Sequence, residues 1–598
     1  MTKTKLLLSA SISAAALAGL SISVAPQLSE DTAGNPFIHP LAMIRSICGE
    51  STDGLAERRA FFVRAARAFA ETTDVGAAKE NILWPELGKI SYEISTDDLD
   101  AQNWFNQGLA FAYNFNHEEA VKAFRRAQSI DPDCAMCFWG EAFSLGPNIN
   151  APMFDEAVAP AYEAVNKALA LRDGASEKER HLINALGYRY EAAPLADRSK
   201  LDNAFADAMD EVALKYPDDN FIAALAAEAN MDTQAWDYWE NGGRDPKGRT
   251  ARTISLIEGI LARNPEHTAA IHLYIHITEA SKDPYRAADH ADRLAGLTPG
   301  LGHLIHMPSH TYYRIGRFKQ SLDHNVKAVE VDQEYLNAAD ASILYEYGYF
   351  THNIHFAMTS AQMAGDKETA LKMAQLLDEK LPIDMAAAAP WVQPIKAAPY
   401  YAKVQFGDPA ANLTDEDPGD AMPFLHGVWH YMRGDAYVKT GDIDAANAEV
   451  EAISKVIAEY DMSALTDGGV PALDILNIAR LTIIARAAAH DGAYDTAVEA
   501  MEEAVALQDA IAYTEPPYWY YPAKQTLAAM LLKAGKTERA EALFLESLTK
   551  SPNNAFVLHG LHEVYKAQGD KNGAKYAKGL FKDAWLGGKK DYPTLTDL

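Results

Sequence analysis

Hydrophobic positions recur every three to four residues along most of this chain, which is the spacing of amphipathic helices and not the alternation of strands. From Ala101 onward, small and aromatic positions follow each other through two helix-length segments that end at Pro132. Small residues let two antiparallel helices approach, aromatic side chains fill the space between them, and a proline ends the second helix. The pattern predicts an all-α chain made of packed helix pairs.

The spacing of these positions is that of a tetratricopeptide (TPR) repeat. The matching residues are Trp104, Gly108, Phe111, Ala120, Phe124, Ala127 and Pro132. Weaker copies follow toward the C-terminus, each with an alanine at the same offset after its turn, for about ten repeats in all. We therefore expect a TPR-type α-solenoid, a right-handed superhelix of helix pairs.

The repeat pattern is interrupted once, over residues 382–420, which are rich in Ala, Pro and Asp. Such a composition is typical of a linker between two blocks of repeats. We expect an N-terminal helical segment at 26–100, a first TPR block at 101–381, the linker at 382–420 and a second TPR block at 421–598.

Residues 1–25 have the pattern of a secretory signal peptide, because Lys3 and Lys5 precede an apolar stretch rich in Ala, Leu and Ser. The alternative is an uncleaved N-terminal anchor, for which the stretch is barely long enough. No other stretch of the sequence has the character of a membrane span. The sequence predicts a periplasmic or secreted protein that is not inserted in a membrane after cleavage.

The charge and cysteine content exclude several classes of function. A formal net charge of −29 repels phosphate backbones and anionic lipids, which argues against nucleic-acid binding. The sequence has no phosphate-binding loop, so we expect no nucleotide cofactor. Cys134 and Cys137 do not form a c-type haem site, since Phe138 stands where histidine is required. We expect a local disulfide between them; Cu(I) ligation with Met136 and Met153 is the alternative.

Histidines repeat with the period of the array. His272 and His276 are followed 34 residues later by His306 and His310. In TPR arrays the first helix of each repeat lines the concave groove, and residues four apart share one helix face. On this alignment three successive groove helices present seven histidines and a carboxylate to the same space. They are His272, His276, Glu279, His303, His306, His310, His352 and His355.

Imidazole and carboxylate together are ligands for Zn, Cu or Fe. We predict a metal site formed by His272, His276, Glu279, His306 and His310, with one or two ions, and with His303, His352 and His355 beside it. Solenoids mostly act as recognition surfaces. We therefore favour a scaffold function, with a protein or peptide ligand in the groove. Alternatives are a metalloenzyme that activates water or oxygen on a small molecule, a metal-free groove whose protonated histidines bind acidic peptides, and simple solvated histidines.

Two aromatic stretches bear on these alternatives. Trp236 and Trp239 lie in a loop inserted into the fourth repeat. They either pack over the groove beside the histidines or hold the loop against its own part of the solenoid. An enzyme needs this loop to enclose the site, whereas a peptide scaffold needs an open groove. The stretch 513–525, "YTEPPYWYYPAKQ", is interpreted as packing at a repeat boundary, and His426 and His430 as structural.

Several segments together resemble a family of bacterial, signal-bearing TPR proteins. They include "YNFNHEEAVKAF", "DPDCAMCFWGEAFSLGPNINAPM", "MDTQAWDYW", "HLYIHITEAS", "GHLIHMPSHTYYRIGRF" and "YTEPPYWYYP". The resemblance covers most of the chain after residue 25. It implies the helical-repeat fold and export, and it supplies no catalytic residues because the reaction of that family is unassigned.

Overall fold

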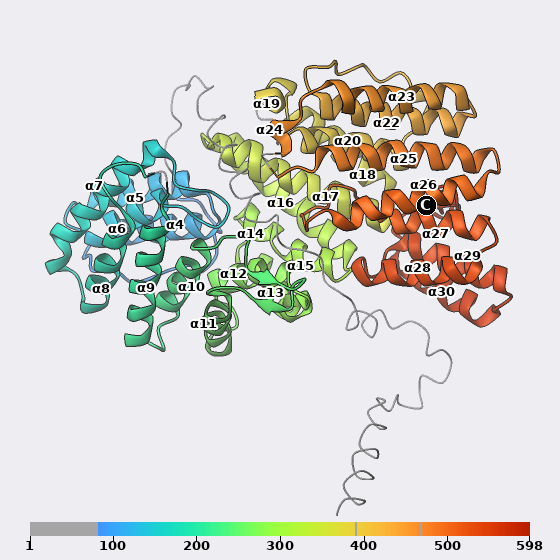
Figure 1. Cartoon of the computed structure of the whole chain (residues 1–598). Coiled ribbons are helices and arrows are strands. Elements are labelled where there is room, and N and C mark those ends of the chain that lie inside the picture. Colours follow the sequence, from blue (N-terminus) through green and yellow to red (C-terminus); the bar gives the residue numbers. More distant parts are fainter. Residues whose placement is uncertain (1–81, 196, 389–391, 467–468) are drawn as a thin grey trace, which may run out of the picture.

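The computed structural model describes residues 82–598 except 196, 389–391 and 467–468 (Figure 1). The predicted signal peptide at 1–25 and residues 26–81 of the predicted helical segment lie outside the described residues. Residues 82–98 form no helix. They run in extended form beside the first helix, where Gln107 accepts from the backbone N–H of Trp84 and Gln102 accepts from that of Ile94. The described part of 26–100 is therefore not the helical segment that we predicted.

Helices make up most of the described chain. The first half contains α4 (Leu99–Tyr113), α5 (His117–Ile130), α6 (Ala135–Leu145), α7 (Asp155–Leu171), α8 (Glu177–Leu186), α9 (Ser199–Lys215), α10 (Asn220–Asp232), α11 (Thr250–Arg263), α12 (Thr268–Glu279), α13 (Ala288–Leu297), α14 (Gly302–His306), α15 (Pro308–Arg314) and α16 (Phe318–Ala338). A short antiparallel pair, β1 (Trp239–Glu240) and β2 (Asp245–Pro246), lies between α10 and α11.

The second half continues the same arrangement. It contains α17 (Thr351–Ala364), α18 (Lys367–Lys380), α19 (Ile383–Ala388), α20 (Gln393–Phe406), α21 (Pro409–Asn412), α22 (Pro423–Thr440), α23 (Ile443–Glu459), α24 (Ser463–Thr466), α25 (Ala472–His490), α26 (Tyr494–Ala510), α27 (Ala523–Lys533), α28 (Thr537–Lys550), α29 (Ala555–Gln568) and α30 (Lys571–Ala584). A π-helical turn at Leu344–Phe350 leads directly into α17.

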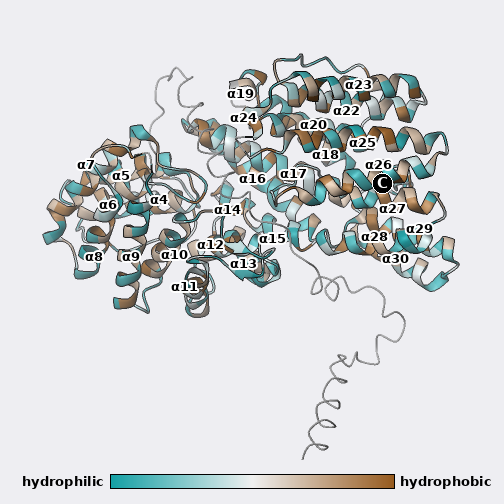
Figure 2. Ribbon diagram, in the orientation of Figure 1, coloured by the Kyte–Doolittle hydropathy of each residue, from teal (hydrophilic) through white to brown (hydrophobic). Residues whose placement is uncertain are grey.

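Consecutive helices pack as antiparallel pairs, and each pair packs on the next. The contact of α4 and α6 with α5 shows what lets neighbouring helices pack closely. A Cβ on Gly108 of α4 would lie 2.7 Å from the ring of Phe124, and one on Gly140 of α6 would lie 2.4 Å from it. Phe124 of α5 thus fills the space that two glycines leave open, which is the packing that the sequence pattern predicted. Figure 2 shows hydrophobic and hydrophilic residues mixed along nearly every helix, as expected for helices with one packed face.

Two large hydrophobic cores meet in the middle of the chain. One contains buried residues between Ile94 and Tyr349, and the other contains buried residues between Leu322 and Leu598. Helices α12 to α17 lie between the two arrays in Figure 1, so the boundary falls there and not at 382–420. Among the described residues, no helix has the length and apolarity needed to cross a bilayer.

The predicted linker at 382–420 is wrong in this respect, because it contains α20. This helix packs on α17, α18 and α22, and its Ala397, Ala398 and Tyr401 are buried in the second core. The prolines that suggested a linker have helical positions instead: Pro394 lies in the first turn of α20 and Pro409 begins α21. Proline is tolerated in a first turn, where its missing N–H has no intrahelical partner to lose.

Candidate metal centre

The predicted histidines meet at the junction of the two arrays. Helix α12 supplies His272, His276 and Glu279; α14 and α15 supply His303, His306 and His310; and α17 supplies His352. On α12 the two histidines are one turn apart and share a face. The side chains are not in a solvated groove: His272, His303 and His306 are at most 2% exposed. Because burial this deep is costly for a polar ring, each ring nitrogen needs a partner.

The first triad consists of His272, His276 and His303. The Nε2 atom of His272 lies 3.0 Å from Nε2 of His276 and 3.2 Å from Nε2 of His303. The three residues can each offer one nitrogen within 4.8 Å of the others. The ring of Phe115 covers the triad, with its centroid 4.5 Å from that of His272 and 5.4 Å from that of His303.

The second triad consists of His306, His310 and His352, whose ligand atoms also lie within 4.8 Å of one another. The Nε2 atoms of His306 and His310 are 2.7 Å apart. The ring of His352 lies 4.8 Å from that of His306 and 5.6 Å from that of His310, centroid to centroid. Phe356 packs against the same rings from α17.

Hydrogen bonds at Nδ1, opposite the Nε2–Nε2 contact, place a proton on Nδ1 of His306 and of His310. Asn325 donates its Nδ2 to the carbonyl of Ser321, so its Oδ1 faces Nδ1 of His306 at 2.5 Å and accepts a proton from it. Nδ1 of His310 faces two carboxylates, Glu279 at 3.0 Å and Glu515 at 3.3 Å, and donates toward them. If both rings are neutral, each Nε2 atom therefore directs a lone pair at the other. At 2.7 Å such a pair requires a proton or a metal ion between them.

The carboxylates form their own cluster behind His310. Glu279 is 1% exposed and accepts a 2.6 Å hydrogen bond from the hydroxyl of Tyr513. Burial opposes its charge, but His310, Glu515 and Tyr513 outweigh burial and lower the pKa of Glu279 to about 2. Burial and then the charge of Glu279 raise the pKa of Glu515 to about 8. At neutral pH the pair therefore carries one negative charge and one proton. Glu279, His310 and Glu515 could also hold an ion directly.

Most of the rings are neutral. Burial lowers the pKa of His272 to about 3, and burial together with neighbouring imidazoles holds the pKa of His276, His303 and His306 well below the usual value. His310 is the exception: burial lowers its pKa, but Glu279 and Glu515 outweigh this and raise it to about 10. Neutral imidazole is the form that binds metals. The acidic-peptide alternative requires the opposite state, several protonated and accessible rings.

The tryptophan loop reaches the first triad. The ring of Trp236 stands edge-on to His276 at 5.2 Å, and its Nε1 donates to Asn150. Trp239 donates its Nε1 to the carbonyl of Ile277 on α12. The loop thus lies on the helix that carries two of the ligands, which is the enclosing position that we associated with an enzyme. His355 is not part of either triad, and its Nε2 lies 2.8 Å from the hydroxyl of Tyr520.

The sequence did not single out Glu515 and Tyr513. Both come from the stretch 513–525, which we interpreted as packing at a repeat boundary, and its Trp519, Tyr520 and Tyr521 are indeed buried in the core. The two residues at its start instead reach α12 and α15, more than two hundred positions earlier in the chain. Only the unusual placement of an acid between tyrosine and two prolines marked this stretch.

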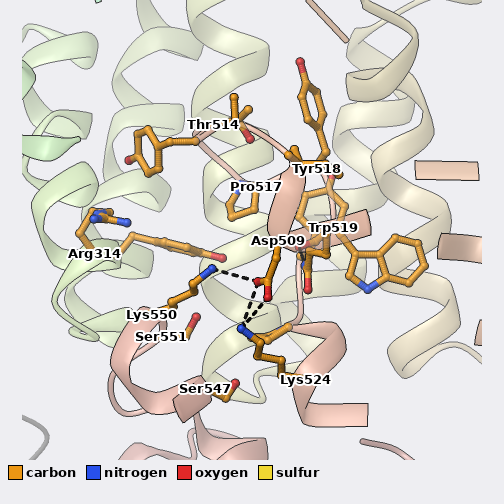
Figure 3. Close-up of a pocket in the computed structure, with 17 residues that line it drawn as sticks. Arg314, Asp509, Thr514, Pro517, Tyr518, Trp519, Lys524, Ser547, Lys550 and Ser551 are labelled. Atoms are coloured by element: carbon orange, nitrogen blue, oxygen red, sulfur yellow. Dashed lines mark hydrogen bonds and ion pairs between the residues drawn. The ribbon is translucent and has the colours of Figure 1, made fainter. Parts of the chain in front are cut away.

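A pocket of about 130 Å³ adjoins the carboxylate cluster (Figure 3). Tyr513 belongs to both, because its ring lines the pocket and its hydroxyl reaches Glu279. The guanidinium of Arg314 lies 4.8 Å from the same ring. Figure 3 shows Lys524 and Lys550 joined to Asp509 at another side of the pocket. Tyr513 and Glu279 thus connect this pocket to His310 of the second triad.

The remaining candidates are Cys134 and Cys137, whose sulfurs are bonded to each other at 2.05 Å. The bond leaves no thiolate there for Cu(I). His426 and His430 lie side by side on α22, where His430 contacts Glu449 at 2.5 Å. Neither belongs to a three-ligand cluster within the described residues.

Comparison with known proteins bears on the fold. The tetratricopeptide repeat family matches residues 101–134, the stretch in which Phe124 packs between two glycines. The fold is a tetratricopeptide-repeat solenoid. No curated protein matches the chain.

Solved structures that match the chain include a human IFIT1 dimer with m7Gppp-AAAA, at 11% identity and a TM-score of 0.28, covering 91% of this chain and 99% of that one. Yeast Tom70 matches at 12% identity and a TM-score of 0.26, covering 79% of this chain and 89% of that one. Neither similarity bears on what this solenoid binds.

Proposed function

We propose that this TPR solenoid is a scaffold protein that holds a transition-metal ion in the second triad. The observation that carries the proposal is the 2.7 Å approach of Nε2 of His306 to Nε2 of His310, two rings whose Nδ1 atoms both have hydrogen-bond partners elsewhere. A hydrogen-bonding partner on the far nitrogen that orients the near nitrogen is the usual second shell of metal-binding histidines.

A proton on His310 is the competing explanation, and it accounts for this pair alone. It does not involve His352, whose ligand atom lies within 4.8 Å of those of both other histidines. A metal ion accepts all three lone pairs at once. The carboxylates of Glu279 and Glu515 then raise the basicity of His310 through its Nδ1.

The donor set favours Zn or Cu over Fe. Three imidazoles with no thiolate suit Zn and Cu, whereas mononuclear Fe(II) sites usually take two histidines and a directly bound carboxylate. In the second triad the carboxylates contact Nδ1 of His310, on the opposite side of the ring from His306.

Elemental analysis of the purified protein tests the proposal. After incubation with Zn or Cu and desalting, we expect about one equivalent or more in the wild type and a loss of about one equivalent in His306→Ala/His310→Ala. The matched control is His426→Ala/His430→Ala, a pair with the same spacing on α22, which should retain the wild-type content. Less than about 0.1 equivalents in the wild type contradicts the proposal.

A second candidate function, a metalloenzyme, is favoured by the enclosure of the centre and by the adjoining pocket. Three protein ligands leave a fourth position on the ion for water, oxygen or substrate. We expect metal-dependent hydrolysis of a small ester, or oxygen uptake with a small reductant, that is lost in His306→Ala/His310→Ala. Full metal loading with neither activity across a broad substrate panel favours the scaffold without catalysis.

Export belongs to the same proposal. The pattern of residues 1–25 supports cleavage by a signal peptidase and a periplasmic or secreted location, where the binding of metal would occur after transport. N-terminal sequencing of the protein recovered from the producing cell tests this directly. A mature protein that still begins at Met1 and fractionates with the cytoplasm contradicts it.

A further inference from the structure

We propose that the first triad holds a second ion at the same time, so that the two triads form one dinuclear centre open to a small bridging ligand. This inference rests on the proposed function and assigns the nuclearity of its site. The sequence pattern had grouped His272, His276, His306 and His310 around a shared site, with the number of ions left open.

The first triad is a complete ligand set by itself. A hydrogen bond from His272 to the backbone of Tyr113 engages one ring nitrogen, and its Nε2 faces both His276 and His303. That Nε2 has one lone pair and can accept one good hydrogen bond, yet two rings point at it. Nδ1 of His276 and Nδ1 of His303 have no partner among the described residues. An ion at the meeting point of the three Nε2 atoms receives a lone pair from each.

The two triads are neighbours. The rings of His276 and His310 are 6.2 Å apart and those of His303 and His306 are 6.0 Å apart, centroid to centroid. In two-metal sites the ions are typically about 3.5–4 Å apart, close enough for one oxygen ligand to contact both. Rings at this spacing, with their Nε2 atoms gathered in two groups, are compatible with such a pair.

The surroundings of the two triads differ, which would suit two metal ions that are held with unequal affinity. The first triad is bordered by Phe115 and Trp236, and among the described residues its ligand cluster contains histidines alone. The second is backed by Glu279 and Glu515, which add basicity to His310. We therefore expect the second ion to be the more tightly held of the two. All-imidazole donor sets at both positions suit Cu or Zn.

The test uses the whole chain, stripped with chelator and reloaded with Cu(II). We expect two equivalents of copper in the wild type and one in His303→Ala, which removes a ligand from the first triad only. His303→Gln serves as a second variant if the alanine variant does not fold, as judged by circular dichroism. The matched control is His355→Ala, a buried histidine of α17 that lies outside both triads and should keep two equivalents.

Electron paramagnetic resonance distinguishes a dinuclear centre from two separate sites. Two Cu(II) ions joined by a bridging ligand couple magnetically, so we expect a wild-type signal well below two spins per chain and a full single spin in His303→Ala. Azide, a small bridging anion, should perturb the wild-type spectrum more than that of the variant. Two equivalents with two full spins overturn the dinuclear inference.

The stoichiometry also separates this inference from the proposed function. One equivalent in the wild type, lost in His306→Ala/His310→Ala but retained in His303→Ala, overturns the second ion and leaves the proposed function standing. No bound metal in any variant overturns both.

Discussion

Tyr513, in the loop before α27, donates its hydroxyl to Glu279 at the end of α12 across 2.6 Å. This bond ties the C-terminal array to the carboxylate that orients His310. In Tyr513→Phe we expect metal affinity to fall by about tenfold, because an outer-shell partner of a metal ligand is lost. Competition with a chromophoric chelator measures the affinity. Tyr313→Phe is the control, since the buried hydroxyl of Tyr313 has no hydrogen-bond partner among the described residues.

The two carboxylates should not be equivalent. The pKa of Glu279, about 2, leaves it ionised, whereas the pKa of Glu515, about 8, leaves it largely protonated at neutral pH. We expect Glu279→Gln to lower metal affinity by about 10- to 100-fold, and Glu515→Gln, an amide close in shape to the neutral acid, by less. The same chelator competition compares them. Equal losses would mean that the two carboxyl groups share the negative charge, and a larger loss in Glu515→Gln would mean that Glu515 carries it.

The stability of the metal-free protein should fall in mild acid. Buried histidines that stay neutral in the fold are His272, His276, His303, His306 and His355. Their folded pKa values are lowered, so the unfolded chain takes up their protons first, near its ordinary value of about 6.5. The stability that they contribute is complete above pH 6.5 and is lost as the pH falls toward their folded pKa values.

Other groups oppose this trend without cancelling it. Glu228, Asp332 and Glu515 have raised pKa values and gain stability as the pH falls from about 8 to their unfolded values. His310, with a raised pKa, loses its contribution only above pH 6.5. The net free energy of unfolding should drop by about 2 kcal/mol or more between pH 6.5 and 5. Thermal or urea unfolding across this range measures it, and a flat profile contradicts the neutral state of the centre.

The glycine packing of the first repeat gives a stability prediction that does not involve metal. In Gly108→Ala the new methyl group would lie 2.7 Å from Phe124, so we expect a loss of about 1–3 kcal/mol from overpacking. Urea unfolding measures the change. Gly579→Ala on α30 is the control, because nothing lies within 4 Å of its added Cβ and alanine has the better helix propensity.

The sequence predicted the fold well where packing is local. Gly108 and Phe124 are close in the chain, and their spacing indicates directly how α4 and α5 pack against each other. The same rule placed His272, His276, His306 and His310 on facing helices, because the repeat period fixes how neighbouring pairs align. It misread 382–420, where alanine and proline suit both a linker and a helix such as α20 that begins with proline.

The repeat period could not predict two features of the site: the burial of its histidines and the contacts between segments far apart in the chain. The repeat alignment predicted an accessible groove, but His306 is fully buried, with Asn325 of α16 and His352 and Phe356 of α17 packed against it. Glu515 and Tyr513 meet α12 and α15 only because the solenoid curves back on itself, and no periodicity in the sequence encodes that distance. His352 was placed beside the site and proves to be part of the second triad.

The contribution of Glu515 has a consequence for how the protein is made. All six imidazoles of the two triads lie between residues 272 and 352, whereas Glu515 is translated much later. A chain that is released or proteolysed before the C-terminal array would keep the imidazoles and Glu279 but lack Glu515 and the hydroxyl of Tyr513. Assembly of the complete centre is thus coupled to completion of the whole polypeptide.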